Sequence, residues 1–522
     1  MIYKKSKIRL IVLFVLFALS SFVFSACSIS EWMESELQDE VPGDTPGNDE
    51  PKDYSVTFTL TRYTGESLDP YLSDSRTNRD LLSLCYDGLI FNNSSYEPVP
   101  VIAESYESDL KRVVFTLNSN ACFSDGTPVT AIDCQYSYSL AMKKNSVYYD
   151  RFDYISDFEV LDDGRFAVYF KTESVYNVNL CDIPIVKRGS DGDFAPIGSG
   201  KYRIVRENAS VYLEKNPYSM VDNGENFEIS KILVHNILST EELLYNFNYN
   251  KIHGSYTDIT DKGSEFRGNI ETVSFCDNSL VFVTVNKTDP ESFLANPSFS
   301  KGLTYCFNRM KICAEILSGG TQPVWYPFNP DWSVTVKAEL NSDIYSTVSA
   351  HDYFTEAGVI LSETVRVYED EPVELKIIVN SENLTKVEVA EFLAHDLEEM
   401  GFKVNLVTLT WDKYLQAIED YEYDIYVGEV MMPQNMDVSA LLSDNVNSGD
   451  KYVEWELNEA IALFNKGELS MRDFLSAYQE ELPIIPLYFN RGALAVNRVV
   501  SGNFAPYNGN LYNGIENWSF SK

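Results

Sequence analysis

The sequence predicts an α/β protein whose strands and helices begin near residue 54 and continue to the end of the chain. Its 522 residues are 44% hydrophobic and 13% aromatic, enough for a large packed core. The segment 54–63, YSVTFTLTRY, alternates apolar and polar residues as a half-buried strand does. The segment 374–409 reads as a strand, an amphipathic helix and a second strand, which together form a βαβ unit.

The N-terminal segment 1–26 reads as an export signal. Residues 1–9 carry four basic side chains, and the stretch that follows is uncharged and largely apolar up to Cys27. The end of this stretch, FSA, resembles the lipobox of bacterial lipoproteins, with Phe24 in place of the usual Leu. Cys27 is therefore the predicted lipidation site. The alternative is an uncleaved anchor helix, and both interpretations place the remaining chain outside the cytoplasm, attached to the bacterial cell membrane.

An acidic stretch, 27–53, separates this signal from the first strand. It mixes acids with Pro and Gly and lacks an apolar period, so we expect a flexible tether. The whole chain has a formal net charge of −37. Such a charge argues against nucleic acid as a partner and weakly favours neutral or cationic ligands.

Periodicity and capping signals place the remaining elements. Thr130 and Asp133 resemble a capping box at the start of a helix that runs to about Met142. The other predicted elements are helices at 79–86, 296–317 and 386–400, the last ended by Gly401, and strands at 113–117, 165–170, 374–379 and 402–409.

Two acids in FSDGTPVTAID could form an acid/base pair, but backbone roles explain both. Asp125 belongs to an Asp-Gly turn, and Asp133 lies in a first helical turn, where acids are common. We therefore interpret this stretch as structural.

The cysteines and histidines give no metal or cofactor signal. Seven cysteines follow Cys27, an odd number without a CxxC motif, and the four histidines are scattered. We expect no metal site and no cofactor, and most of the thiols should act as small core residues.

Six motifs occur in the order known from one family. They are LDPYLSDSRTNRDLLSLCYDGLIF (68–91), PVIAESYESD (100–109), FTLNSNACFSDGTPVTAID (115–133), PIGSGKYRI (196–204), LTYCFNRMKICAEILSGG (303–320) and LPIIPLYFN (482–490). Over 54–520 the chain resembles the family 5 extracellular solute-binding proteins, the receptor lipoproteins of ABC importers for oligopeptides, dipeptides, nickel and related solutes.

The resemblance implies a two-lobed periplasmic-binding-protein-like fold with an extra N-terminal subdomain and mixed sheets flanked by helices. Lobe I would comprise 54–275 and 480–522, with the subdomain near 77–190, and lobe II would comprise 280–475. It also implies a monomeric receptor that is not an enzyme. This receptor would capture a small solute, an oligopeptide or a related compound, between its lobes and deliver it to ABC permease subunits in the membrane.

Other functions have less support. The string LSGGTQ (317–322) resembles the signature loop of an ABC ATPase, but the chain has no GxxxxGK[ST] loop, and Gly319 and Gly320 stand where a helix cap is expected. An exported hydrolase of peptides or sugars is a less favoured alternative, because neither GxSxG nor HExxH occurs and no two carboxylates stand out as a glycosidase pair. A ligand-sensing lipoprotein on the same fold remains an alternative.

The resemblance also suggests ligand-binding residues. In peptide-binding relatives, an Asp in a DYPDP-like run pairs with the ligand's α-amino group, and that Asp is missing from 423–442. Either Glu429 substitutes for it, or the ligand presents no α-amino group. Trp411 is assigned to the framework. The predicted ligand-binding residues are Tyr63, Thr64, Tyr148, Tyr149, Trp325, Tyr326, Glu429, Met431, Met432, Gln434, Asn435 and Tyr488.

Overall fold

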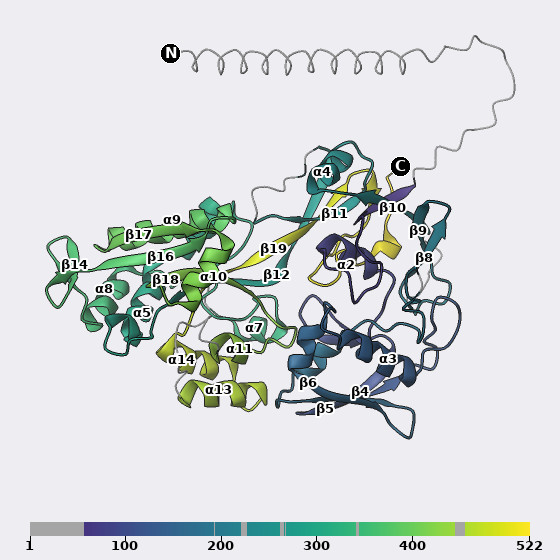
Figure 1. Ribbon diagram of the computed structural model, residues 1–522, viewed down its shortest axis with the longest axis horizontal. Helices are drawn as coiled ribbons and strands as arrows, with labels where there is room; N and C mark the ends of the chain where they lie inside the picture. The colour runs from purple at the N-terminus through teal and green to yellow at the C-terminus, as the bar shows by residue number, and fades with distance from the viewer. Residues whose placement is uncertain are drawn as a thin grey trace, which may run out of the picture. The chain divides into compact units, whose positions relative to one another are not determined.

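Three sheets of four or more strands organise the part of the chain that this computed structural model describes (Figure 1). That part comprises residues 57–192, 194–220, 227–260, 266, 268–340, 344–443 and 455–521. The export signal, Cys27 and the tether lie outside the described residues. Thr57–Lys522 forms one compact unit. Among the described helices, none has the length and apolar character needed to cross a membrane.

The first sheet contains the predicted N-terminal strand. β1 (Phe58–Tyr63) pairs in parallel with β10 (Lys231–Ile237), and β9 (Ser210–Lys215) and β8 (Tyr202–Glu207) extend the sheet with antiparallel pairing. The helix expected at 79–86 exists but lies three residues earlier, as α2 (Arg76–Leu82), because Ser75 accepts a hydrogen bond from the Asn78 N–H and caps it. α4 (Thr240–Asn248) follows β10.

The second sheet lies within the segment expected to form the subdomain. Its strand order is β4 (Ala103–Asp109), β5 (Arg112–Leu117), β7 (Phe166–Phe170) and β6 (Ile155–Val160), all antiparallel. The predicted strands at 113–117 and 165–170 are confirmed as β5 and β7. The smaller elements here are β2 (Ile90–Asn92), β3 (Pro98–Pro100), and the 3₁₀ turns η1 (Tyr149–Asp153) and η2 (Asn177–Cys181).

The third sheet has six strands and contains the predicted βαβ unit. Its order is β11 (Gly254–Asp258), β19 (Ile485–Asn497), β12 (Ile270–Val285), β18 (Ile425–Met431), β16 (Glu374–Asn380) and β17 (Lys403–Leu409). β16 and β17 are parallel and are joined by α9 (Leu384–Glu399), which confirms the unit. β12 and β19 are the long strands of this sheet, with 16 and 13 residues.

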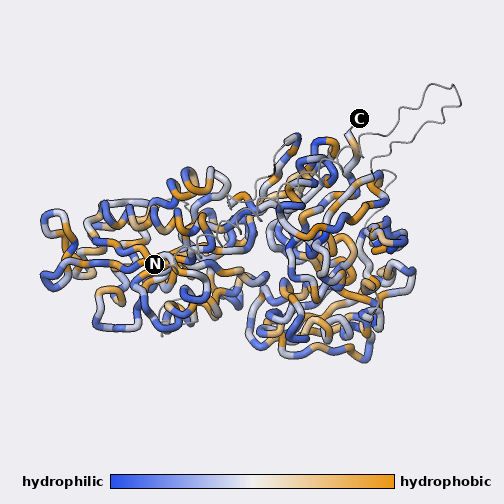
Figure 2. The backbone as a smooth tube through the Cα atoms, turned by 45° about the horizontal axis from the view of Figure 1, so that its top comes forward, coloured by the Kyte–Doolittle hydropathy of each residue, from blue (hydrophilic) through white to orange (hydrophobic). Residues whose placement is uncertain are grey.

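Alternation along these strands divides the core into two layers. Leu280 and Phe282 of β12 face one hydrophobic cluster, and Val281 and Val283 face another. Hydrophobic and hydrophilic residues alternate along much of the backbone (Figure 2). The covering helices are α5 (Pro297–Cys306), α6 (Arg309–Lys311), α7 (Ser333–Ala338), α8 (Thr347–Glu356), α10 (Trp411–Glu419), α11 (Ser439–Ser443), α13 (Trp455–Asn465) and α14 (Met471–Glu481). The remaining short elements are η3 (Phe293–Ala295), β13 (Ile360–Ser362), β14 (Val365–Tyr368), β15 (Glu371–Pro372), β20 (Val500–Ser501), η5 (Ile515–Asn517) and β21 (Ser519–Phe520).

The single helix expected over 296–317 is wrong. α5 ends at Cys306, Phe307 is extended, and the chain resumes as α6 and the π-helical turn η4 (Ile312–Ile316). Asn308 causes the break, because its side chain caps the Lys311 N–H while its own N–H donates to Asp396 Oδ2 at 2.9 Å.

The structural interpretation of FSDGTPVTAID is confirmed. Thr130 and Asp133 form the capping box of α3 (Ala131–Ala141), with the Thr130 N–H 3.0 Å from Asp133 Oδ2. Asp125 accepts the Thr127 N–H at 3.0 Å and pairs with Lys187. Desolvation acts to raise the pKa of Asp125, but these hydrogen bonds lower it to about 2, so this carboxylate stays ionised near neutral pH.

The glycine cap after η4 is also confirmed. Gly319 has a positive φ of 72°, and its N–H donates to the Cys313 carbonyl at 2.8 Å. The seven described cysteines are unbridged, and all except Cys122 are buried, as expected of core thiols.

Candidate functional site

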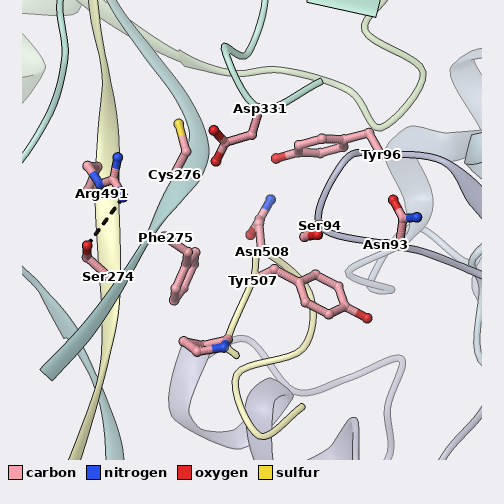
Figure 3. A pocket seen from close by; sticks show the side chains of 11 residues that line it. Asn93, Ser94, Tyr96, Ser274, Phe275, Cys276, Asp331, Arg491, Tyr507 and Asn508 are labelled. Carbon is pink, nitrogen blue, oxygen red and sulfur yellow. Dashed lines mark hydrogen bonds between the residues drawn. The ribbon is translucent and has the colours of Figure 1, made fainter. Parts of the chain in front are cut away.

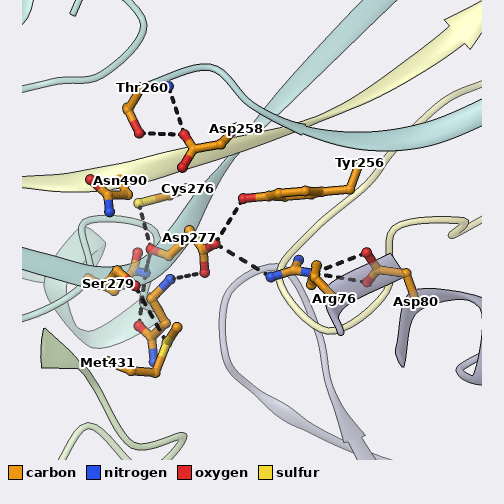
Figure 4. Close-up of polar contacts among 12 residues, drawn as sticks. Arg76, Asp80, Tyr256, Asp258, Thr260, Cys276, Asp277, Ser279, Met431 and Asn490 are labelled. Carbon is orange, nitrogen blue, oxygen red and sulfur yellow. Dashed lines mark hydrogen bonds and ion pairs between the residues drawn. The ribbon is translucent and has the colours of Figure 1, made fainter. Parts of the chain in front are cut away.

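The candidate site lies where β12 and β19 pass from β11 to β18 (Figure 1). Cys276 pairs with Arg491 and Leu280 with Phe489, and the register shifts between these two pairs. Such a bulge bends the strand and redirects its side chains. We call the residues around it the crossing site (Figure 4), which comprises the polar side chains and one methionine: Arg76, Asp80, Tyr256, Asp258, Asp277, Ser279, Lys386, Glu429, Asn490 and Met431.

Arg76 ties α2 to the bulge (Figure 4). Its Nε lies 3.1 Å from both carboxylate oxygens of Asp80, and its Nη1 lies 3.5 Å from Asp277 Oδ2. The guanidinium stacks 4.6 Å from the centre of the Tyr256 ring, whose hydroxyl donates to Asp277 at 3.4 Å. Desolvation opposes the charge, but the two carboxylates raise the pKa of Arg76. The charge of this cation is therefore balanced by two carboxylates, and it connects α2 to the bulge, although its Nη2 is buried without a hydrogen-bond partner.

Glu429 already has partners in the crossing site. Its Oε2 contacts Lys386 Nζ, and its Oε1 accepts a hydrogen bond from Asn490 Nδ2 at 3.0 Å. The side chains of Lys386 and Glu429 are only 16% and 27% exposed. Asn383 caps the start of α9 by accepting the Lys386 N–H at 2.9 Å, which places this cation beside Glu429. The carboxylate is therefore neutralised before any ligand arrives.

Exposed apolar side chains surround the ends of the parallel strands. Met431, the last residue of β18, is 59% exposed, and Leu384 at the start of α9 is more exposed still. Trp411, which follows β17, is 47% exposed and stacks on Tyr414. The assignment of Trp411 to the framework stays a prediction, because a ring that stacks on Tyr414 can be exposed without contacting a ligand. The carboxyl ends of parallel strands are a common place for ligands in α/β sheets.

A cavity of about 170 Å³ lies on the other face of β19 (Figure 3). Asn490 and Arg491 are consecutive residues of one strand, so their side chains point to opposite faces. Asn490 joins the crossing site, whereas Arg491 lines the cavity. The lining residues are Asn93, Ser94, Tyr96, Ser274, Phe275, Cys276, Asp331, Arg491, Pro506, Tyr507 and Asn508.

Several predicted residues gather beside this cavity. Trp325 and Tyr326 pack edge to face at 5.5 Å and share a hydrophobic cluster with Met432 and Tyr96. Burial raises the pKa of Tyr326 to about 12, and nearby Cys276 and Asp331 add to the shift.

Other predicted residues are enclosed or lie elsewhere. Tyr488 is only 1% exposed and packs in the core, so it offers no face to a ligand in this conformation. Asn435 is buried with its Nδ2 unbonded, and Gln434 is half-buried. Four predicted residues do not contact Glu429. The hydroxyl of Tyr63 shares a hydrogen bond of 3.2 Å with the Thr240 hydroxyl, and the Tyr148 ring packs on Tyr71 with 6.2 Å between ring centres. The other two, Thr64 and Tyr149, are exposed.

Sequence reasoning missed Arg491, Asp331 and Lys386. The sequence did contain a signal for Arg491, because it is the single charged residue in the strand IPLYFNRGALAVN. A charge within such an apolar strand needs a partner or a function. Among the described residues, no group of three His, Cys, Asp or Glu could hold a metal ion.

Comparisons with known proteins place the chain among solute receptors. The profile of "Bacterial extracellular solute-binding proteins, family 5 Middle" matches residues 97–452. The periplasmic oligopeptide-binding protein OppA of Salmonella typhimurium is 23% identical over 495 residues, covering 85% of this chain and 89% of the relative. The oligopeptide-binding protein OppA of Bacillus subtilis is 22% identical over 513 residues, with the same coverage.

The fold is also found in a solved structure. The unliganded, open form of the periplasmic murein tripeptide binding protein MppA superposes with a TM-score of 0.71 at 17% identity. The alignment covers 89% of this chain and 98% of that one.

Proposed function

The chain belongs to the family 5 bacterial extracellular solute-binding proteins, and we propose that it captures a peptide or a peptide-derived solute for an ABC importer. As a member of this family it is a solute receptor and not an enzyme. The observation that carries the proposal is the pair of long strands, β12 and β19, that connect β11 with β18 through a bulge beside polar side chains. Such a connection can act as the hinge of a closing receptor.

The proposed solute class follows from chemistry and relatives together. The two relatives described above are named for oligopeptides. Exposed Met431 and Trp411 offer apolar contact, which suits a ligand with apolar side chains. We expect lobe I to comprise 54–275 and 480–522, with the subdomain at 77–190, and lobe II to comprise 280–475.

We propose that Glu429 does not anchor a ligand ammonium group. Lys386 contacts its carboxylate, and Asn490 donates to it. A ligand cation would have to displace Lys386, leaving a poorly exposed ammonium group without its partner, which costs free energy. Recognition of an α-amino group, where it occurs, therefore uses another acid.

The membrane attachment is a proposal from the sequence. Cys27 carries the lipid, the acidic stretch 27–53 provides reach, and the receptor works as a monomer that delivers its solute to permease subunits.

The test is to purify the full chain and identify its bound solute by native mass spectrometry. We expect the protein to carry a ligand whose mass fits a peptide and which is released chemically unchanged. Adding the identified solute back at 100 times Kd should raise the unfolding free energy by about 2.7 kcal/mol. A chain that carries no solute, and that no member of a broad peptide panel stabilises, would refute the proposed function.

A further inference from the structure

The cavity on the Arg491 face holds a cation, Arg491, that makes no direct ion pair among the described residues. The Arg491 guanidinium donates one recorded hydrogen bond, from Nη2 to Ser274 Oγ at 3.3 Å (Figure 3). Its Nε is buried without a partner, and the guanidinium forms no ion pair with any described carboxylate. A half-buried cation in this state is incompletely compensated.

The same cavity also holds an anion, Asp331, without a direct ion-pair partner among the described residues. Asp331 is half-buried and forms no ion pair within the described ranges. Its backbone N–H donates to Asn329 Oδ1 at 2.9 Å, which fixes the turn that presents the carboxylate. Burial raises the pKa of Asp331, while Arg491 and a hydrogen bond from the Cys276 backbone oppose the shift. The two opposite charges share one cavity without neutralising each other by direct contact.

Hydrogen bonds of Asn329 hold the turn that carries Asp331. Asn329 is buried, and its Nδ2 lies within 3.1 Å of three acceptors: the Tyr96 hydroxyl, the Asp277 carbonyl and Asn278 Oδ1. It therefore connects the Asp331 turn to the bulge of β12. Prearranged polar groups of this kind favour a ligand that matches them, because little has to be reorganised on binding.

Size and charge together define the ligand group. At about 30 Å³ per water, a cavity of about 170 Å³ holds about six waters. An ordinary peptide carries its ammonium and carboxylate groups at opposite ends and cannot place both there. A group with both charges on one carbon fits the volume and compensates both residues.

We propose that this cavity binds an α-amino-acid group, with the carboxylate at Arg491 and the ammonium at Asp331. The proposal rests on the function proposed above and specifies the chemistry that the receptor recognises. The group is either a free amino acid or the end of a side-chain-linked peptide, such as a γ-glutamyl compound.

Calorimetry on the full chain tests this with defined probes. L-alanine and γ-L-glutamylglycine carry an ammonium and a carboxylate group on one carbon. Propionate lacks the ammonium group and ethylamine lacks the carboxylate group. Triglycine carries both groups, but at opposite ends of the peptide. We expect at least one of the first two to bind at least tenfold more tightly than propionate and ethylamine. Whichever of the two binds identifies the source of the group.

Variants then assign the charges. Arg491→Met and Asp331→Asn should each weaken the zwitterionic probe on the order of ten- to a hundredfold. Arg498→Met, at an exposed position just beyond β19, should leave its affinity unchanged. If Arg491→Met does not fold, Arg491→Gln and Arg491→Lys replace it, and only the charge-keeping Lys should retain part of the affinity.

The outcomes separate this proposal from the proposed function. Equal binding of the zwitterionic probe by wild type and both folded variants would overturn the assignment of the charges. A copurified peptide together with no binding of either zwitterion would overturn the inference and leave the receptor function standing. A loss of binding confined to the Arg491 variants would show that only a carboxylate is recognised, which also contradicts the proposal. A chain that binds no solute at all would refute the receptor function itself.

Discussion

Replacing Glu429 with Gln separates the two interpretations of the crossing site. The change keeps the size and the hydrogen bond from Asn490 and removes the negative charge beside Lys386. Because both side chains are mostly but not fully buried, the stability cost should lie between the values for exposed and buried pairs, about 1–2 kcal/mol. A ligand ammonium anchored on Glu429 would in addition cost roughly 2–5 kcal/mol of peptide affinity.

We expect the affinity for the copurified solute to change less than about threefold, which corresponds to under ~0.7 kcal/mol. The assay is calorimetric titration of wild type, Glu429→Gln, Lys386→Met and the double variant, with urea unfolding of each ligand-free protein. The double variant removes both charges and should recover most of the stability lost in either single variant.

A thirtyfold or greater loss of affinity in Glu429→Gln for a free-amine peptide, absent for the N-acetylated peptide and not restored by Lys386→Met, would refute this reasoning. So would a solved complex in which Glu429 contacts a ligand ammonium group while Lys386 has moved away.

Three further predictions concern anchoring, pH and packing. Cys27→Ser should release the protein from membranes and block processing of 1–26; intact mass of the wild type checks this, and a retained signal would contradict it. Burial raises the pKa of Asp87 from 3.8 to about 6, so the folded state holds this proton more tightly, and the stabilisation present below about pH 4 is lost as the pH rises towards 6. The unfolding free energy of Asp87→Asn relative to wild type should therefore rise by about 2 kcal/mol between pH 4 and 7, and parallel urea curves across this range would contradict the assignment. Gly198→Ala should lower the unfolding free energy by about 2–3 kcal/mol, because a Cβ there would collide with the Cys85 carbonyl; an unchanged melting temperature would show that this approach is looser.

Sequence patterns predicted the local elements where neighbouring residues decide the conformation. The capping box at Thr130 and Asp133, the glycine cap at Gly319 and the unit 374–409 all follow from such signals. The break at Phe307 did not, because it depends on Asp396, which is distant in sequence and accepts the Asn308 N–H. Contacts between distant residues leave no local periodicity.

The candidate site was harder to predict for the same reason. Glu429 was identified from its position in the chain, but its neutralisation depends on Lys386, which only the fold brings near. Tyr488 was chosen because aromatic residues often line ligand sites, yet the register of β19 buries it. Aromatic content alone cannot distinguish core from surface, since Trp411 belongs to the same residue class and is 47% exposed.

The pleat of β19 gives the two faces of this region different chemical roles. A shift of one residue in register would exchange the faces and bring Arg491 to Glu429. The bulge between Cys276 and Leu280 therefore has to be held in place, and Arg76 and Asn329 hold it from two sides through Asp277. Because Glu429 already contacts Lys386 while Arg491 and Asp331 form no direct ion pair, we expect a charged solute to gain more free energy from the cavity than from Glu429. Discrimination between solutes should accordingly respond to substitutions in the cavity, and closure to substitutions that loosen the bulge.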